Sequence, residues 1–347
     1  MKNKRGLVAC ILFLIVFAIV TIYRETKQTK EAVYQQNEGI IFNTIYHITY
    51  QYDSDLQAEI EDELHLFDAT LSPFNKTSVI TRVNENDSTV VLNEWFVNVF
   101  SRSREIWTQT DGAFDPTVSP LINAWGFGFK QGYSLSSHDI DSLLQFVGMD
   151  KISLDNGKVI KQDPRMSLNF SAIAKGYAVD VVAELLESKG IENFLVEIGG
   201  ELVGKGRNPK GECWQVGINK PEEDSESVMG EIEEIVAICD GAMATSGNYR
   251  NFRYENGKRV AHTIDPVSGY PVQHSLLSAT VIAPDCMTAD AYATAFMVMG
   301  IDKSLQLAEK LQLNAYFIYA VDSVNTQVKM TPGMKDLIVP VSYTHLR

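Results

Sequence analysis

The chain has 347 residues, of which 45% are hydrophobic and 21% charged, a composition typical of a folded globular protein of one or two domains. Its formal net charge is −14, and its first 30 residues are basic, so the rest of the chain is more acidic still. Such a surface repels phosphate backbones, which excludes nucleic acid as a favoured partner. An anionic ligand would therefore need a local cation such as a metal ion.

The cysteines argue against a disulfide-rich scaffold and against a structural zinc site. No pair has a CxxC spacing, and Cys10 lies within an apolar N-terminal run. The three others, Cys213, Cys239 and Cys286, allow at most one disulfide, and the sequence leaves their pairing open.

That apolar run opens the chain. Residues 7–22 (LVACILFLIVFAIVTI) carry no charge and follow three basic residues, which favours a bilayer segment with a cytoplasmic N-terminus. We therefore expect residues 1–23 to be a membrane anchor or signal segment and residues 24–39 a tether. The remaining chain is expected on the periplasmic side of the inner membrane. A cleaved signal peptide and lipidation at Cys10 stay open as alternatives.

Strands and helices are predicted to follow one another without a regular repeat. Residues 41–52 are rich in β-branched and aromatic side chains, which predicts a strand. Apolar residues at helical spacing predict one helix from Leu56 to Phe67 and another beginning at Asn93. The stretch GAFDPTVSPLINAWGFG, residues 112–128, is punctuated by glycine and proline and indicates a loop.

The second half of the chain is predicted to be richer in strands. In chain order we expect a hairpin over residues 151–162, a helix capped by Ser171 and running to Lys189, short strands over residues 194–281, helices over residues 288–300 and 303–313, and closing strands. Because strands and helices are interspersed without βαβ units, the predicted fold class is α+β, with mixed sheets and packed helices.

One motif is a decoy. GGELVGKG, residues 199–206, matches the phosphate-loop pattern GxxxxGK, but Gly206 stands where Ser or Thr would bind magnesium. No helix is predicted after it, so tight turns between strands are the better interpretation.

Three stretches carry candidate chemistry, and each has a plainer interpretation. In LNFSAIAKGYAVD (residues 168–180), a helix start and Lys175 suit a phosphate, although a capped amphipathic helix is the simpler explanation. In HTIDPVSG (residues 262–269), His262 beside a rigid turn suits a general base, although structural histidines are commoner. In TADAYATAFMVMG (residues 288–300), Asp290 and Thr294 share one helix face and suit Mg²⁺, although the helix dipole alone explains the aspartate.

With these stretches in this order along the sequence, the chain resembles the ApbE family of flavin transferases, which attach FMN from FAD to a threonine of a target protein. The matching stretches are LSPFNKTSVITRVN, GAFDPTVSPL, LNFSAIAKGYAVD, VEIGGELVGKG, MATSGNYRNF, HTIDPVSGYPV and TADAYATAFMVMG. They cover most of residues 40–300, so the resemblance is specific. It implies a two-lobed, ApbE-like (T-fold-like) flavin transferase domain over residues 40–341.

The resemblance also implies roles for individual residues. It implies Mg²⁺ binding by Asp290, Thr294 and the backbone carbonyl of Ala172, and it places His262 to deprotonate the acceptor threonine. Contacts to FAD, the substrate, are implied for Phe42, Phe74, Ala113, Phe114, Asp115, Asn169, Lys175 and Ile264.

Three positions depart from the family pattern. Phe42 and Asn43 stand where Met-Gly is usual, Asn169 stands where aspartate is usual, and Ala293 stands where some relatives have a second aspartate. These departures bear on FAD affinity and hydrolytic side activity more than on the fold.

Two rival functions stay open beside the transferase. The first is a Mg²⁺-dependent FAD pyrophosphatase that releases FMN and AMP, with water in place of threonine. The second is a membrane-tethered FAD-binding protein without enzymatic activity. The resemblance implies an acceptor flavoprotein as partner, either a membrane redox subunit or an exported flavoprotein, and the sequence does not select between them.

Overall fold

A computed structural model describes residues 33–127, 135–221, 232–248, 252–255, 258–322 and 325–340. The expected anchor over residues 1–23 lies outside the described residues, as does the segment 222–231. Within the described ranges, no helix is long and apolar enough to cross a membrane.

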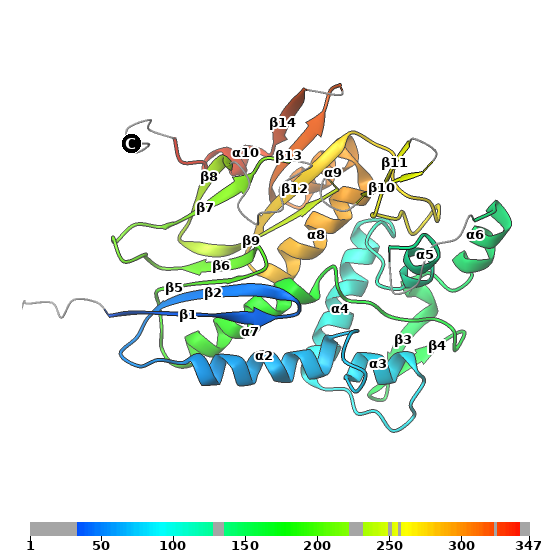
Figure 1. The fold of residues 1–347 in the computed structure, drawn as a ribbon, viewed down its shortest axis with the longest axis horizontal. Coiled ribbons are helices and arrows are strands. Elements are labelled where there is room, and N and C mark those ends of the chain that lie inside the picture. Colours follow the sequence, from blue (N-terminus) through cyan, green and yellow to red (C-terminus); the bar gives the residue numbers. More distant parts are fainter. Residues whose placement is uncertain are drawn as a thin grey trace, which may run out of the picture.

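An eight-stranded sheet forms the centre of the fold (Figure 1). Its spatial order is β1-β2-β5-β6-β9-β12-β13-β14. The strand bounds are β1 (Tyr34–Ile41), β2 (Thr44–Gln51), β5 (Phe194–Ile198), β6 (Glu201–Lys205), β9 (Asp240–Gly247), β12 (Leu276–Ala283), β13 (Asn314–Ala320) and β14 (Thr326–Met330). All described pairings are antiparallel, so the α+β class is confirmed, while the expected mixture of strand directions is replaced by antiparallel pairing.

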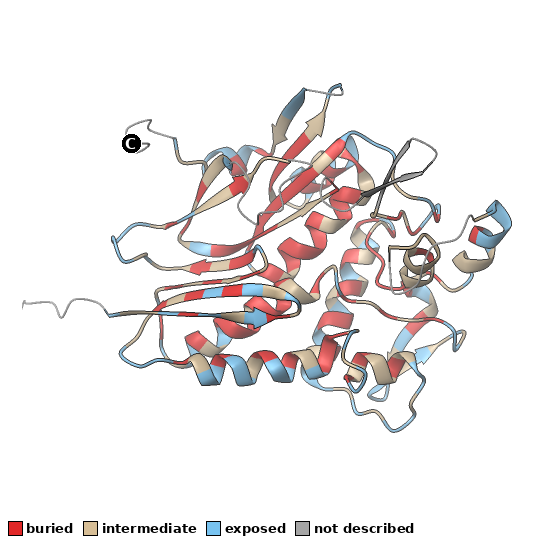
Figure 2. Cartoon of the chain, in the orientation of Figure 1, coloured by how far each residue is buried: buried red, intermediate tan, exposed pale blue. Residues whose placement is uncertain are grey.

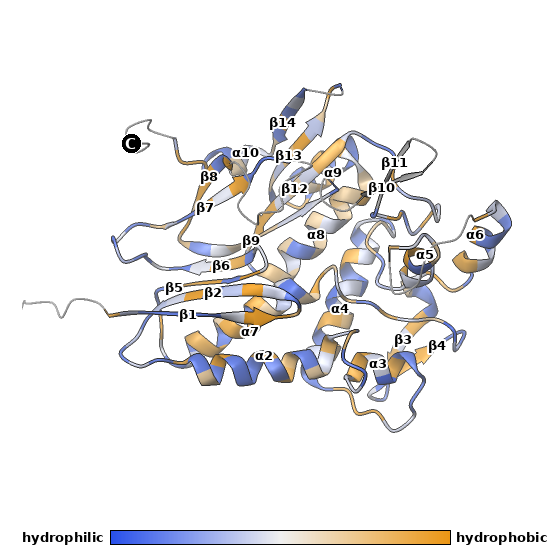
Figure 3. Ribbon diagram, viewed as in Figure 1, coloured by the Kyte–Doolittle hydropathy of each residue, from blue (hydrophilic) through white to orange (hydrophobic). Residues whose placement is uncertain are grey.

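Helices cover one face of this sheet and form the main core with it. They are α2 (Gln57–Leu71), α4 (Glu94–Gln109), α7 (Ala174–Ser188) and α8 (Cys286–Met299). Figure 2 shows α7 and α8 buried along nearly their whole length, whereas α2 is exposed along one side. Figure 3 shows the matching hydropathy, with alternating hydrophilic and hydrophobic residues on α2 and a mostly hydrophobic β12. The helices predicted at Leu56, Asn93 and residues 288–300 are confirmed.

A second, smaller core lies on the opposite face. The hairpin of β7 (Trp214–Asn219) and β8 (Ile232–Ile238) packs there with α10 (Pro332–Lys335), against side chains from β6, β9, β12 and β13. A disulfide joins Cys213, just before β7, to Cys239, just before β9. Cys286 is a free, buried cysteine. One disulfide thus forms, within the limit set by the cysteine count.

The remaining elements surround these cores. They are α3 (Val79–Asn84), α5 (Ser119–Ala124), α6 (Ser137–Leu144), the 3₁₀ helix η1 (Met149–Lys151), the hairpin β3 (Ile152–Asp155) and β4 (Lys158–Lys161), the hairpin β10 (Phe252–Glu255) and β11 (Lys258–Ala261), and α9 (Ile301–Lys310). The hairpin predicted over residues 151–162 is confirmed, and the GxxxxGK decoy spans the β5–β6 turn, with positive φ at Gly199 and Gly200, and strand β6.

Three expectations are wrong in detail. The tether proposed for residues 24–39 includes strand β1, whose polar residues lie at the edge of the sheet, where one side of the strand faces solvent. The stretch 112–128 contains helix α5, which begins at a proline-containing first turn. Ser171 does not cap α7, because that helix begins two residues later than expected, after Ile173, and Ser171 lies in the preceding turn.

Candidate functional site

Two neighbouring cavities meet at Ser171, just before α7. The first has a volume of about 280 Å³ and is lined by Ala113, Phe114, Asp115, Pro116, Val118, Ile122, Asn169, Ser171, Ala172, His262, Thr263, Ile264, Pro266, Thr294 and Val298. The second has a volume of about 230 Å³ and is lined by Phe42, Phe67, Leu71, Ser72, Pro73, Phe74, Ser171, Ala174 and Lys175. We call them the first and the second cavity.

The structure brings the predicted site residues to these two cavities. Eight of them line the first cavity, namely Ala113, Phe114, Asp115, Asn169, Ala172, His262, Ile264 and Thr294. Three line the second cavity, namely Phe42, Phe74 and Lys175. Asp290 lines neither, because it is 3% exposed and lies one helical turn before Thr294, beneath the start of α7. Segments more than 200 residues apart in the chain therefore converge on one place.

The turn before α7 is held by side-chain and backbone hydrogen bonds. The Asn169 amide oxygen accepts the Ser171 N–H at 2.8 Å, and the Asn169 N–H donates to the Pro116 carbonyl at 2.7 Å. The N–H groups of Ile173 and Ala174 both donate to the Phe170 carbonyl. The free row of amides that the sequence suggested for a phosphate is thus largely engaged, so charge for a phosphate must come from a side chain or a cation.

A cluster of charged groups lies beneath this turn. The ammonium group of Lys175 contacts the Glu201 carboxylate at 2.6 Å, and Glu201 is 4% exposed at the start of β6. Burial raises the pKa of Glu201 although Lys175 opposes the shift. Burial would lower the pKa of Lys175, but the carboxylates of Glu201 and Asp290 raise it overall. The two acidic groups and the lysine therefore form one electrostatic unit beside the second cavity.

Asp290 belongs to the same unit. One of its carboxylate oxygens accepts the Gly176 N–H of α7 at 3.1 Å. Burial raises its pKa, and the nearby Lys175 opposes that shift. A buried carboxyl group with a raised pKa and a nearby cavity is typical of functional sites.

Thr294 follows Asp290 on the same face of α8 and reaches the first cavity. Its hydroxyl shares a hydrogen bond of 3.0 Å with the Ser246 hydroxyl of β9. Carboxylate, hydroxyl and carbonyl oxygens from Asp290, Thr294 and Ala172 are the donors that Mg²⁺ prefers. Within the described ranges no group of three or more His, Cys, Asp or Glu side chains could hold a metal, so a cation here would depend on this mixed oxygen set together with water or ligand oxygens.

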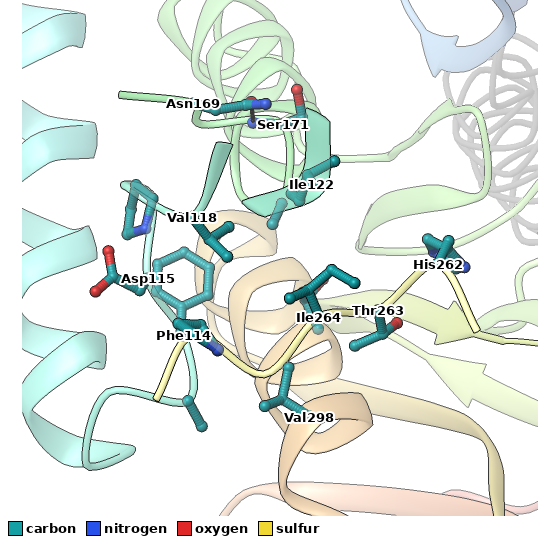
Figure 4. A pocket seen from close by; sticks show the side chains of 15 residues that line it. Phe114, Asp115, Val118, Ile122, Asn169, Ser171, His262, Thr263, Ile264 and Val298 are labelled. Atoms are coloured by element: carbon teal, nitrogen blue, oxygen red, sulfur yellow. Dashed lines mark hydrogen bonds between the residues drawn. The ribbon is translucent and has the colours of Figure 1, made fainter. Parts of the chain in front are cut away.

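His262 is placed by a rigid turn. It is half-buried at the wall of the first cavity, and the Thr263 hydroxyl after it donates to the Asn248 side chain at 2.5 Å. An isolated bridge pairs Ile264 with Pro271 across the turn. Figure 4 shows His262 and Asp115 at opposite ends of the view, with Phe114, Val118 and Ile264 between them. The His262 imidazole and Thr294 therefore line the same cavity, whose other walls are largely apolar.

Asp115 is committed to the protein itself. One of its oxygens accepts the Thr117 N–H at 2.8 Å and the Thr117 hydroxyl at 2.6 Å, and the other accepts the Trp107 indole N–H at 3.0 Å. Burial raises the pKa of Asp115 while these donors oppose the shift. Its side chain shapes the 113–115 loop, so any contact of this residue with a ligand is expected from its backbone.

Phe42 lies in the tip of the β1–β2 hairpin. Phe42 and Asn43 both have positive φ, at 51° and 59°, as a two-residue hairpin turn requires. That geometry explains why glycine would suit position 43. The Phe42 ring packs edge-on against Phe67 at 5.9 Å, while Phe74 is 65% exposed at the rim of the second cavity. Both aromatic residues line that cavity.

Sequence reasoning missed Glu201 and Asp180. Glu201 lies within the quoted VEIGGELVGKG stretch and is followed by the apolar Leu202, so a charged residue inside a strand was the available signal. Asp180 closes the LNFSAIAKGYAVD stretch, and its carboxylate accepts two N–H groups at the start of α8. No local pattern could reveal that contact, because the partners are more than 100 residues away.

Comparisons with known proteins identify the family of this chain. The sequence profile of the ApbE family matches residues 42–317. A Haemophilus influenzae protein named FAD:protein FMN transferase is 38% identical over 301 residues, covering 82% of this chain and 86% of that protein. Its Escherichia coli K12 counterpart of the same name is 35% identical over 298 residues, covering 82% of each chain.

Solved structures give the same result. The flavin transferase ApbE from Vibrio cholerae superposes with a TM-score of 0.78 at 34% identity, covering 88% of this chain and 99% of that chain. The apo flavinyl transferase ApbE from Pseudomonas stutzeri gives 0.79 at 32% identity, covering 88% and 96%. The α+β architecture, the converging site residues and these matches lead to one conclusion: the chain belongs to the ApbE family.

Proposed function

We propose that this protein is an FAD:protein FMN transferase that attaches FMN to a threonine of an acceptor protein in a Mg²⁺-dependent reaction and releases AMP. The observation that carries the proposal is the convergence of His262, Thr294 and Ala172 on the first cavity, directly beside Lys175 in the second. The names of the relatives support the same activity.

The two cavities suit FAD as substrate. A dinucleotide has two large ring systems joined by a diphosphate, and the cavities meet at Ser171 beside the ammonium group of Lys175. The second cavity offers Phe42 and Phe74 to an aromatic ring, because aromatic pairs prefer offset or edge-on contact. The first cavity offers the apolar side chains Phe114 and Ile264. A chain this acidic needs local positive charge to hold the diphosphate.

Asp290, Thr294 and the Ala172 carbonyl would hold Mg²⁺. When bound, the ion supplies charge that stabilises the bridging and leaving oxygens of a phosphoryl transfer. A hydrogen bond from the Gly176 N–H orients the Asp290 carboxylate, and a hydrogen bond with the Ser246 hydroxyl orients the Thr294 hydroxyl. Both side chains are therefore held in place by the protein itself.

His262 would act as general base. The threonine oxygen of the acceptor forms a bond to the FMN phosphorus, the bond from that phosphorus to the bridging oxygen breaks, and AMP leaves with the bridging oxygen. The threonine proton passes to the imidazole of His262. The turn held by Asn248 and Pro271 limits the movement of His262, which favours one orientation toward the first cavity.

We also propose that the domain works outside the cytoplasm, held at the inner membrane by residues 1–23. The Cys213–Cys239 disulfide supports this location, because disulfides persist mainly in oxidising compartments. The acceptor would then be a membrane redox subunit or an exported flavoprotein with an exposed threonine.

The test is a product analysis. The protein is incubated with FAD, Mg²⁺ and an acceptor domain that carries a candidate threonine, and the acceptor's intact mass is measured beside a Thr→Ala acceptor. The proposal predicts that only the threonine acceptor gains the mass of FMN less water, with release of AMP. Free FMN and AMP with an unmodified acceptor would instead identify a pyrophosphatase, and unchanged FAD would identify a binding protein.

A further inference from the structure

The first turn of α8 is capped by two different carboxylates. Asp285 precedes the helix and accepts the Thr288 N–H at 2.7 Å, as an N-cap residue does. Asp180 comes from the middle of α7 and accepts the Cys286 N–H at 2.7 Å and the Met287 N–H at 2.8 Å, one with each oxygen. The first three amides of α8, which lack partners within their own helix, are therefore all engaged by carboxylates.

The start of α7 is capped in return by α8. The Gly176 N–H lies in the first turn of α7 and donates to the Asp290 carboxylate. Each helix thus supplies the carboxylate that binds N–H groups in the first turn of the other. Position 176 also sets the separation of the helices, because an added Cβ there would lie 2.2 Å from the Cys286 carbonyl oxygen. The crossing is too close for any residue but glycine.

Asp180 has no part in either cavity. It lines neither of them, and its two hydrogen bonds both go to α8. Burial raises the pKa of Asp180, the nearby charges of Asp285 and Glu184 add to that rise, and the two amide donors oppose it. Burying a charged carboxylate near other acidic groups costs free energy. The two hydrogen bonds that Asp180 accepts from α8 offset part of that cost.

We infer that Asp180 is a positioning residue that fixes the start of α8 against α7, so that Asp290 and Thr294 keep their places relative to Ala172. This inference rests on the proposed Mg²⁺ site. The distance from Ala172, before α7, to Asp290, on α8, is set by how the two helices are joined. Asp180 accepts N–H groups at the start of α8, and Asp290 accepts an N–H group at the start of α7. Of these two residues, only Asp290 is a proposed metal ligand.

The test compares two variants that each remove one negative charge near the start of α8. Asp180→Asn keeps a single acceptor oxygen and places an NH₂ group against an N–H donor, so one cross-helix bond is lost. Asp285→Asn keeps the N-cap, since asparagine caps as well as aspartate. Binding of Mn²⁺ to the full chain is measured by electron paramagnetic resonance. We expect Asp180→Asn to weaken binding roughly tenfold, as loss of supporting partners does at metal sites. Asp285→Asn should stay within about twofold of the wild type, because its cap persists.

A measurement on the wild type removes dependence on how the variant folds. Amide hydrogen exchange at Cys286 and Met287 is compared with that at Asp302 and Lys303, in the first turn of α9, which has no side-chain cap. Protection at α8 well above that at α9 supports the joint, and equal exchange would overturn it.

Asp290→Ala separates this inference from the proposed function. If Asp290→Ala abolishes Mn²⁺ binding while Asp180→Asn binds as the wild type does, the positioning role is wrong and the metal site stands. If Asp290→Ala binds Mn²⁺ as the wild type does, the metal assignment itself is wrong, and the role of Asp180 at that site is overturned with it. If Asp285→Asn weakens binding as much as Asp180→Asn, charge alone explains the effect, and the positioning role is again overturned.

Discussion

The site combines two regions that are built differently. At the junction of α7 and α8, buried carboxyl groups lie beside a half-buried lysine, as Glu201 does beside Lys175, and backbones approach so closely that glycine is required at position 176. The first cavity is walled instead by loops around residues 113–115 and 262–264, with apolar side chains and few charges (Figure 4). The junction fixes charge, while the loops give shape and carry His262.

This difference assigns separate tasks to the two regions. Charge that must stay in one place is held by helices whose ends are joined to each other, because a helix end offers N–H groups of fixed direction. The surface that we propose for substrate and acceptor is made from loops, which vary more readily without loss of the core. Substitutions at the junction should therefore impair metal binding or folding, whereas substitutions in the loops should impair catalysis and leave the core intact.

The largest effect is expected from Asp290→Ala at the junction. Loss of the metal should remove several kcal/mol of transition-state stabilisation, so FMN transfer should fall at least about 10³-fold. Transfer is measured by intact mass over a range of Mg²⁺ concentrations. The control is Asp302→Ala, which removes an exposed carboxylate on α9 and should leave transfer unchanged. Full activity of Asp290→Ala at any Mg²⁺ concentration would contradict the metal assignment.

His262→Ala tests the loop region. Loss of a general base should lower the transfer rate by about 10²–10⁴-fold. FAD affinity, measured by flavin fluorescence, should change little, because the cavity keeps its apolar wall. His138→Ala, in exposed helix α6, serves as the control. A collapse of FAD affinity would make His262 a binding residue and move the base elsewhere.

The sequence predicts those features of the two regions that depend on residues close together in the chain. Helices α2 and α4 follow from apolar spacing and from Asn93, which caps α4 locally. Most of strand β1 falls within the expected tether, because an edge strand needs few apolar residues and so resembles a polar linker in sequence. The positions of site residues came from resemblance to a family. The contact of Asp180 with Cys286 was not predictable, since no local rule links groups 106 residues apart.

Gly176→Ala tests the closeness of the junction. In an open helix this change would be stabilising by roughly 1 kcal/mol. Here the added methyl group would overlap the Cys286 carbonyl, so the free energy of unfolding should fall by about 1–3 kcal/mol. Urea unfolding followed by circular dichroism measures it. Ser188→Ala, exposed near the end of the same helix, should change stability by less than about 0.5 kcal/mol. A stabilised Gly176→Ala protein would show that the helices are not so closely packed.

A pH dependence is expected from Glu201. Burial raises its pKa in the folded state, so between pH 4.5 and neutrality the folded protein holds a proton that the unfolded chain has released. The contribution of Glu201 to the free energy of unfolding is therefore present below pH 4.5 and is lost as pH rises through the folded-state pKa. In EDTA, Glu201→Gln should flatten this fall in urea unfolding curves. The same slope in both proteins would show that Glu201 ionises normally.

We propose above all that the α7–α8 junction holds the cation at which the FAD diphosphate reacts. Anomalous scattering from crystals soaked with Mn²⁺ and FAD tests it most directly. We expect a manganese peak next to the Asp290 carboxylate, the Thr294 hydroxyl and the Ala172 carbonyl. A manganese peak away from these three oxygens, in crystals where FAD occupies the two cavities, would contradict it.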